Sequence, residues 1–184
     1  QIDSTPIVCI TGQVASALLG TDAFQETDVV GISMPVTKWN FQVTKAAEIP
    51  RAIAKAFYIA KSGRPGPVLI DITKDAQFET FEFQYKPFKS MRSYVPIYKL
   101  NLNRIEEAAN LINSAKKPLV VFGQGVILSE AEEVFKTFIE KAGLPSAWTI
   151  LGLSALESDH HLNVDMLGMH GNYAPNKLTN ECDL

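Results

Sequence analysis

The amino-acid sequence predicts an α/β fold: parts of two doubly wound, mostly parallel-sheet domains joined by an extended linker. The first observation is the stretch 64–75, where a Pro/Gly turn leads into the apolar run 68–70, then Ile72, and then charged residues. This pattern is typical of a buried strand in a parallel sheet. The second is the alternation of helical and strand patterns after residue 101, and the third is the aromatic stretch between the two regions.

Short apolar runs and one helical pattern precede the buried strand. The predicted elements are, in order, a strand at 6–10 followed by a turn at 11–13, a short helix at 28–34, a half-buried strand at 39–43, a helix at 48–62 and the buried strand at 67–72. Pro35 and Gly63 are the expected stops of the two helices. The chemistry of such a unit is expected where its parallel strands end.

Residues 74–100 are rich in aromatic and basic side chains and contain scattered prolines. Aromatic residues of this kind can stack on nucleic-acid bases. We favour an extended connection whose aromatics pin it across the surfaces of two domains. The formal net charge of −3 and the pI near 5.6 also give no bulk attraction to nucleic acid or to anionic lipid.

The region after the connection repeats a clearer pattern. We expect, in order, a helix with a capping box at Asn103 and Glu106, a strand at 119–122, a Gly123-Gln124-Gly125 turn, a helix with a second box at Ser129 and Glu132 that ends at Gly143, and a strand at 146–150. This alternation of strands and helices is the doubly wound pattern.

Two features suggest a bound anion, although neither is specific. Gly123-Gln124-Gly125 stands where a strand gives way to a helix, which is a place where backbone N–H groups approach phosphates; the third glycine of the dinucleotide fingerprint is missing. A plain turn is the alternative. Arg64 could grip the same phosphate with its guanidinium, or could be a surface arginine before a turn.

The segment 167–171 and the histidines call for separate interpretations. The two glycines of Leu167-Gly168-Met169-His170-Gly171 suggest a backbone pressed against either another loop or a bound ligand. His160, His161 and His170 fit no metal-ligand spacing, so we expect no metal site. The residues alone therefore indicate an α/β protein, with nucleotide binding and plain turns as the two open interpretations of these features.

Composition excludes several classes of protein. With 46% hydrophobic and 20% charged residues, the chain has the composition of an ordinary globular protein. No apolar run approaches the ~20 residues of a membrane span, and no signal peptide is recognisable. Cys9 and Cys182 lack disulfide or zinc spacing, so we expect buried, reduced thiols and a cytoplasmic location. The start at Gln1 and the uncapped end suggest a fragment.

A series of short motifs resembles the catalytic subunit of the acetolactate synthase (acetohydroxyacid synthase) family. The motifs are Thr11-Gly12-Gln13-Val14, Gly20-Thr21-Asp22-Ala23-Phe24-Gln25-Glu26, Thr37-Lys38-Trp39-Asn40, Ser62-Gly63-Arg64-Pro65-Gly66-Pro67-Val68, Lys74-Asp75 and Met166-Leu167-Gly168-Met169-His170-Gly171. They follow one another in the family's order and spacing over nearly the whole chain. Related thiamine-diphosphate enzymes share the architecture, but not all of these motifs.

The resemblance implies the domains and the cofactors. Residues 1–75 would be the C-terminal half of the domain that binds the pyrimidine of thiamine diphosphate, 76–100 the linker, and 101–184 the start of the central, flavin-binding domain. The complete enzyme would use thiamine diphosphate, Mg²⁺ and FAD. The family's catalytic glutamate would lie before Gln1 and its diphosphate–magnesium segment after Leu184. We therefore expect no complete catalytic set in this chain, and no binding of thiamine diphosphate or Mg²⁺ by it alone.

The resemblance also implies roles for individual residues. Phe24 and Gln25 would line the pocket for the second 2-keto acid, the first as a shield and the second orienting the substrate carbonyl. Gln13 would belong to the same pocket and Lys74 to the mouth of the substrate channel. The implied FAD contacts are Arg64, Gly123, Gln124, Gly125, Thr149, Ile150, Leu167, Gly168, Met169 and His170.

The implied activity is decarboxylation of pyruvate and transfer of the two-carbon unit to pyruvate or 2-oxobutanoate, in branched-chain amino-acid biosynthesis. A homo-oligomer and a regulatory small subunit are the expected partners. Another thiamine-diphosphate carboligase or decarboxylase, such as a glyoxylate carboligase, and a non-catalytic nucleotide-binding domain remain the alternatives. Three departures from the family pattern are Ala15 and Thr73, where proline is common, and Gln124, where glycine or alanine is common.

Overall fold

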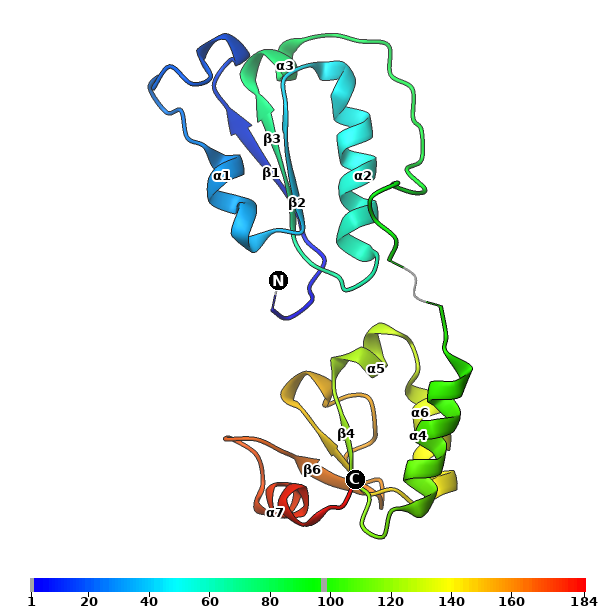
Figure 1. Ribbon diagram of the computed structural model, residues 1–184. Coiled ribbons are helices and arrows are strands. Elements are labelled where there is room, and N and C mark those ends of the chain that lie inside the picture. Colours follow the sequence, from blue (N-terminus) through cyan, green and yellow to red (C-terminus); the bar gives the residue numbers. More distant parts are fainter. Residues whose placement is uncertain (1, 97–98) are drawn as a thin grey trace. The chain divides into compact units, whose positions relative to one another are not determined.

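The computed structural model describes residues 2–96 and 99–184, which fall into two compact units, Gln1–Lys99 and Leu100–Leu184. Each unit contains a three-stranded, wholly parallel sheet with helices packed on it (Figure 1). The predicted α/β fold with parallel sheets is therefore confirmed. Among the described residues, no helix is both long and apolar enough to cross a membrane.

Unit 1 is organised around its central strand. Its elements are β1 (Val8–Gln13), α1 (Val29–Ser33), β2 (Trp39–Val43), α2 (Ile49–Lys61), β3 (Val68–Thr73) and α3 (Lys74–Phe78), with 3-10 turns at Ser16–Leu18, Met34–Val36 and Ala46–Glu48. The strand order is β1-β3-β2. Every residue of β3 is buried, as the apolar run predicted.

The two faces of β3 have different chemistry. Val68, Ile70 and Ile72 pack with the buried side of α2 in one apolar cluster. Successive side chains of a strand point to opposite faces, so Asp71 and Thr73 lie on the other face. Figure 1 shows α1 and α2 on opposite sides of this sheet. The α2 face is therefore a dry core, whereas the α1 face carries polar groups.

The connection after β3 differs in part from its prediction. Lys74–Phe78 forms the short helix α3 rather than extended chain. The stretch that follows lies along α2, where the rings of Phe88 and Tyr94 meet Tyr58 edge-on, with centroids 5.4 and 6.4 Å away. The Tyr94 hydroxyl also donates to the Ser62 carbonyl at 2.8 Å. These contacts pin the connection to unit 1.

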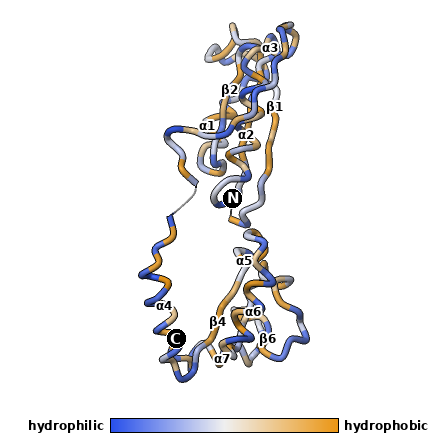
Figure 2. Tube along the Cα trace, turned by 90° about the vertical axis from the view of Figure 1, so that its right-hand side faces the viewer, coloured by the Kyte–Doolittle hydropathy of each residue, from blue (hydrophilic) through white to orange (hydrophobic). Residues whose placement is uncertain are grey.

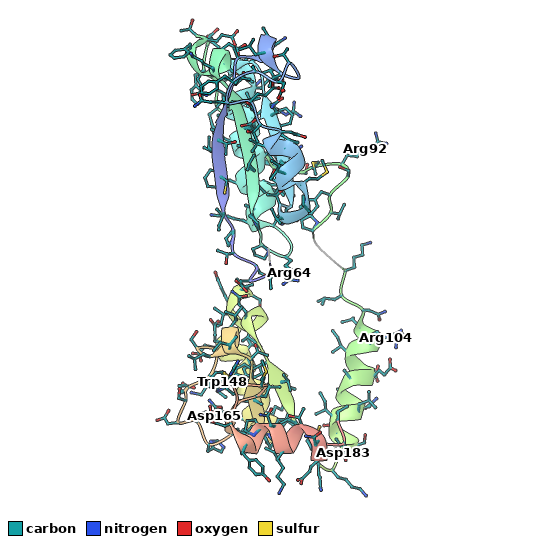
Figure 3. The ribbon with its side chains drawn as sticks, turned by 90° about the vertical axis from the view of Figure 1, so that its left-hand side faces the viewer. Arg64, Arg92, Arg104, Trp148, Asp165 and Asp183 are labelled. Carbon is teal, nitrogen blue, oxygen red and sulfur yellow. The ribbon has the colours of Figure 1, made fainter. Side chains whose placement is uncertain are left out.

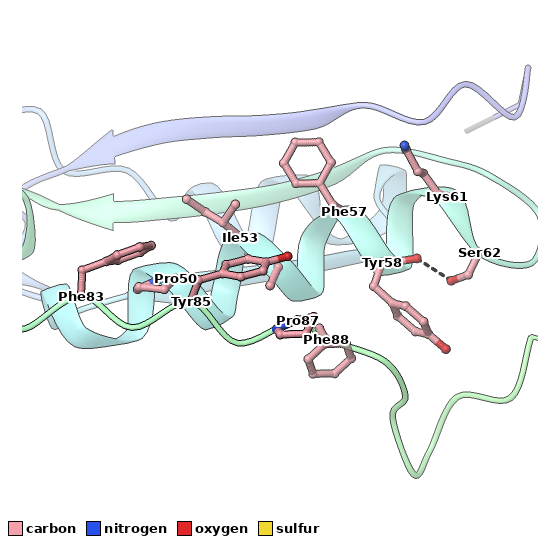
Figure 4. Close-up of a pocket in the computed structure, with 11 residues that line it drawn as sticks. Pro50, Ile53, Phe57, Tyr58, Lys61, Ser62, Phe83, Tyr85, Pro87 and Phe88 are labelled. Carbon is pink, nitrogen blue, oxygen red and sulfur yellow. Dashed lines mark hydrogen bonds between the residues drawn. The ribbon is translucent and has the colours of Figure 1, made fainter.

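A groove of about 790 Å³ lies between α2 and this connection (Figure 4). Its walls are mostly apolar, with Phe57 from the helix and Phe83 and Tyr85 from the connection. Tyr98, which was expected to belong to the same aromatic set, lies outside the described residues.

Unit 2 contains a second parallel sheet, of order β4-β5-β6. Its elements are α4 (Leu102–Ser114), β4 (Val120–Phe122), α5 (Gln124–Leu128), α6 (Glu132–Ala142), β5 (Ser146–Trp148), a 3-10 turn at Ile150–Gly152, β6 (Asn163–Met166) and α7 (Tyr173–Glu181). Phe122, Ile139 and Leu144 form the centre of its core.

Two helices of unit 2 have N-terminal caps that differ from those predicted from the sequence. Asn101, not Asn103, caps α4, and its side chain accepts from Arg104 N at 3.3 Å. Ser129 does not cap α6 either, since its hydroxyl donates back to the Gly125 carbonyl at 2.6 Å, within α5. The stop at Gly143 is confirmed: its φ of 62° ends α6 in the left-handed conformation.

Strand limits and three whole elements also differ from the prediction, one of them being α5, which replaces the expected Gly123-Gln124-Gly125 turn. β1 continues through the expected turn to Gln13, because it pairs with β3 along its full length. β5 is shorter than expected and ends at Trp148. β6 and α7 were not predicted at all. Cys9 is exposed rather than buried, on the edge strand β1, where hydrophobic residues gather (Figure 2).

Candidate functional site

The predicted pocket residues of unit 1 lie where its strands end. Gln13 is the last residue of β1, and Lys74 directly follows β3. The parallel register pairs Gln13 with Thr73, so the two positions share one edge of the sheet. A backbone hydrogen bond from Lys74 N to Val14 O at 3.4 Å joins the two segments. Lys74 is exposed at this edge.

The Gln13 side chain is 8% exposed, and both ends of its amide are engaged. Its Nε2 donates to Thr27 O at 2.6 Å and to Asp71 Oδ2 at 3.1 Å. Its Oε1 accepts from Val14 N at 2.9 Å. Gln13 therefore connects the end of β1 to the end of the loop that carries Phe24 and Gln25.

Asp71 lies beneath Gln13 and is fully buried. Its carboxylate accepts from Thr11 Oγ1 at 2.7 Å and from the side-chain amides of Gln13 and Gln42, each at 3.1 Å. This role of Asp71 was not predicted from the sequence. The available signal was a single charged residue inside an apolar strand, since a buried charge requires partners.

The loop from Gly20 to Glu26 presents Phe24, which is 89% exposed, together with Gln25. Gln25 itself has a φ of 67°, in the left-handed region. The Glu26 carboxylate accepts from Gly20 N and, at 3.0 Å, from Ala23 N. The backbone hydrogen bond from Gly20, followed by that from Ala23, lowers the pKa of Glu26 below its usual 4.5. Sequence reasoning missed this role of Glu26.

A second carboxylate holds the chain between β1 and the Gly20–Glu26 loop. Asp75, in the first turn of α3, accepts from Ser16 N at 2.9 Å and from the Ser16 hydroxyl. These bonds hold the pKa of Asp75 well below its usual range. The residues that replace proline do not alter the backbone here, because Ala15 has a φ of −59° and Thr73 a φ of −65°, both within the range of proline.

Arg64 lies in the loop that leads into β3, at the opposite end of the strand from Lys74 (Figure 3). Its Nε donates to Ser4 Oγ and its Nη2 to Ile2 O, both at 2.7 Å. Arg64 belongs to unit 1 and the Gly123–Gly125 turn to unit 2. Their grouping around one ligand stays a prediction.

In unit 2 the remaining predicted residues gather at one sheet edge. Gly123, Thr149 and Leu167 directly follow β4, β5 and β6. Thr149 N donates to Phe122 O at 2.9 Å and Leu167 N to Trp148 O at 3.1 Å, which continues the ladder to the edge. The carboxyl ends of parallel strands are where ligands of this fold class bind.

Glycines let the backbone segments of this edge approach one another closely. A Cβ on Gly123 would lie 2.9 Å from Thr149 Oγ1, and a Cβ on Gly152 would lie 2.9 Å from Gly123 Cα. Helix α5, which starts at Gln124, has only five residues, so its dipole contributes less than the expected helix terminus would. Gly152 was not identified from the sequence.

The loop after β6 is held by one side chain. Asn176 of α7 accepts from Gly168 N and donates to Gly168 O, each at 2.9 Å. Gly168 has a φ of 105°, and a Cβ on Gly171 would lie 2.3 Å from Met166 O. The tight turn leaves Met169 92% exposed. One backbone segment therefore does pack closely against another here, and Met169 and His170 are exposed.

The exposed residues of this edge are mainly apolar: Ile150, Leu151, Leu153 and Met169. Three neighbouring strand ends span about 10 Å, since parallel strands lie about 4.8 Å apart. An apolar strip beside glycine-lined backbone suits a long ligand with a planar ring and a phosphate group. The residues present thus fit a dinucleotide such as FAD.

The histidines take other positions. His160 Nε2 lies 3.0 Å from Glu140 Oε1, and its Nδ1 accepts from Leu162 N at 3.2 Å. His161 stacks beside it, with ring centroids 4.7 Å apart, while His170 is exposed at the sheet edge. The parts of the chain that are described contain no group of three metal-ligating side chains.

Comparisons with known proteins identify relatives of this chain. The family model of the thiamine pyrophosphate enzyme central domain matches residues 105–184. The acetolactate synthase large subunit of Corynebacterium glutamicum is 48% identical over 93% of this chain, and isozyme 1 of Escherichia coli K12 is 44% identical over 100% of it. These alignments cover 27% and 32% of the two relatives, so the chain spans about a third of their length or less.

A solved structure shows the same fold. It comes from Mycobacterium smegmatis, is provisionally assigned as a thiamin diphosphate-dependent enzyme, and superposes with a TM-score of 0.73 and 25% identity over 91% of this chain and 32% of its own. Two kinds of comparison, by sequence and by structure, therefore lead to one group of proteins. Along its whole length the chain matches a segment of the acetolactate synthase large subunits, and its residues 105–184 match the thiamine pyrophosphate enzyme central domain.

Proposed function

We propose that this chain is a segment of an acetolactate synthase that decarboxylates pyruvate and transfers the resulting two-carbon unit to pyruvate or 2-oxobutanoate. The observation that carries the proposal is the match to acetolactate synthase large subunits along the whole chain. The positions of Gln13 and Lys74 at one sheet edge, beside the loop with Phe24 and Gln25, support it.

In this proposal the residues of unit 1 handle the second keto acid. Phe24 shields the reacting carbon from water, and the Gln25 amide donates to the carbonyl oxygen of the acceptor. Lys74, exposed at the same edge, attracts the carboxylate of the incoming keto acid electrostatically. Gln13 has its amide committed to Thr27, Val14 and Asp71, and so it supports the pocket wall.

The cofactors of the proposed enzyme are thiamine diphosphate, Mg²⁺ and FAD. Thiamine diphosphate, when bound, stabilises the carbanion left by decarboxylation. The glycines and apolar side chains at the unit 2 edge would hold FAD, with Arg64 as a further contact. Gln124 would stand beside its phosphates. In this proposal FAD has a structural role and the chain alone binds neither thiamine diphosphate nor Mg²⁺.

The proposal extends to the cellular context. The pathway would be the biosynthesis of valine, leucine and isoleucine, in the cytoplasm. The complete enzyme would form a homo-oligomer and could take a regulatory small subunit. The exposed apolar side chains of β1, among them Ile10, are consistent with a surface that further chain or another subunit covers.

The experiment compares the complete protein with the present 184 residues. The complete protein, supplied with thiamine diphosphate, Mg²⁺ and FAD, should convert pyruvate to acetolactate, measured as acetoin after acid decarboxylation. The 184-residue chain should show no turnover. A complete protein that releases acetaldehyde or another carboligation product instead would refute the proposed reaction, and turnover by the 184 residues would refute the proposed division of the active site.

A further inference from the structure

We propose that Glu26 is a positioning residue: its carboxylate sets the conformation of the loop that carries Phe24 and Gln25, and thereby the choice of the second keto acid. The inference rests on the proposed function, because it assigns these two residues to the acceptor pocket. Glu26 itself points into its own loop, where both carboxylate oxygens bind backbone N–H groups, and it does not act on substrate.

The loop adopts a conformation that L-residues resist. Gly20, Asp22 and Gln25 have φ values of 77°, 58° and 67°. For residues other than glycine, the left-handed region costs about 1 kcal/mol or more each. The loop therefore needs a compensating interaction, and the bonds from Gly20 N and Ala23 N to the Glu26 carboxylate supply it.

The two ends of the loop are already fastened independently of Glu26. Thr21 N and Thr21 Oγ1 both donate to Leu18 O, at 3.2 and 2.7 Å. At the other end, Gln13 Nε2 donates to Thr27 O at 2.6 Å. Loss of the Glu26 carboxylate should therefore release the tip of the loop, with Phe24 and Gln25, while the sheet beneath keeps its structure.

A glutamine cannot replace the carboxylate at this position. Oε1 accepts from Gly20 N and Oε2 from Ala23 N, so both oxygens must be acceptors. A glutamine side chain has the same size, but it has one acceptor oxygen and an NH₂ group that would face a backbone donor. Glu26→Gln thus removes one of the two bonds without creating a cavity, and Glu26→Ala removes both.

The predicted consequence falls on the acceptor step alone. A misplaced loop changes how well each acceptor is held, and small misplacements have large kinetic effects. In the complete enzyme, with pyruvate and 2-oxobutanoate in competition, we expect Glu26→Gln to change the ratio of the two products about threefold and Glu26→Ala about tenfold. Consumption of pyruvate in the first step should stay within about twofold of the unmodified enzyme.

The experiment has a second readout that needs no activity. Hydrogen–deuterium exchange of the complete protein should show faster exchange in peptides that contain Gly20 and Ala23 for both variants, and unchanged exchange in β3. Glu82→Gln is the matched control: Glu82 is exposed in the same unit and, among the described residues, forms no hydrogen bond or ion pair.

The outcomes separate the two proposals. If the unmodified complete protein forms no acetolactate, the proposed function is wrong, whereas the exchange data still test the role of Glu26 in the loop. Unchanged product ratios and unchanged loop exchange in Glu26→Gln and Glu26→Ala would overturn the inference. Faster exchange throughout unit 1, including β3, would also overturn it, since Glu26 would then hold the fold rather than the loop.

Discussion

The carboxyl edges of the two sheets are built by different means. In unit 1 three acidic side chains shape the edge, since Glu26 and Asp75 bind backbone N–H groups and Asp71 fixes the Gln13 amide. In unit 2 the edge is shaped by close packing at Gly123, Gly152 and Gly171. The uncharged side chain of Asn176 also holds it, through a hydrogen bond from Gly168 N. The first edge thus presents side chains and the second an open surface of backbone and apolar groups, which under the proposed function would serve a small polar substrate and an extended ligand respectively.

The strongest test of this comparison is to add a methyl group at the unit 2 edge. Gly171→Ala places a Cβ 2.3 Å from Met166 O, and backbone must move to accommodate it. We expect unit 2 to lose about 3 kcal/mol of unfolding free energy. Gly125→Ala is the control: its Cβ meets nothing within 4 Å, and alanine in α5 should be neutral or stabilising by up to about 1 kcal/mol. Thermal unfolding measures both.

In unit 1 the corresponding test changes a carboxylate. Asp71→Asn keeps the shape, but it removes the charge that strengthens these hydrogen bonds and replaces one of the two acceptor oxygens with an NH₂ group. The expected loss is about 1–3 kcal/mol, read from denaturant unfolding. Asp3→Asn, at an exposed position, should be neutral within about 0.5 kcal/mol. Equal stability of the two variants would show that the charge of Asp71 contributes nothing to stability.

A third prediction concerns flavin binding, which in the proposed function involves residues of both units. If Arg64 contacts a flavin phosphate, Arg64→Ala in the complete enzyme should lose about 1.5–3 kcal/mol of flavin affinity, or one to two decades. Activity should return with excess FAD, and Arg64→Lys should restore binding only in part, since lysine lacks the planar fork. Full flavin occupancy in Arg64→Ala at limiting FAD would assign Arg64 another role, such as its bonds to Ile2 and Ser4.

The smallest expected effect is a difference between the two sheet edges in how amide exchange depends on pH. The folded-state pKa values of Glu26 and Asp75 lie below the usual 4.5 and 3.8, so their contribution is complete above those values and is lost as pH falls through the lowered pKa values. As pH falls, exchange relative to the intrinsic rate should rise at Gly20 and Ala23 only below 4.5, and at Ser16 only below 3.8. Gly168 N, bonded to the uncharged Asn176, should not respond. An equal response at Gly168 would contradict the proposed difference.

The sequence was sufficient where one local signal decided the structure. The buried strand β3, the half-buried β2 and the stop at Gly143 follow from an apolar run, an alternating pattern and a left-handed glycine. The family motifs also located positions that do share sheet edges, such as Gln13 with Lys74 and Gly123 with Thr149. Their contacts with ligand remain predictions.

The remainder depends on contacts that no local pattern encodes. β6 is short and polar, contains Asp165 with a φ of 83°, and exists because it pairs with β5. The cap of α4 moved from Asn103 to Asn101 because two asparagines lie within one turn and only tertiary structure chooses between them. Glu26 and Asp75 look like ordinary surface acids until the loops fold back onto them.

Asp71 also bears on how the sheet assembles. Parallel strands can pair out of register, and a slip by one residue turns every side chain of a strand to the other face. For β3 such a slip would drive the carboxylate into the apolar layer formed with Ala56 and Ile59, where an unpaired ion costs several kcal/mol. One charged residue in the centre of a hydrophobic strand thus selects the correct alignment against its nearest competitors while the chain is still folding.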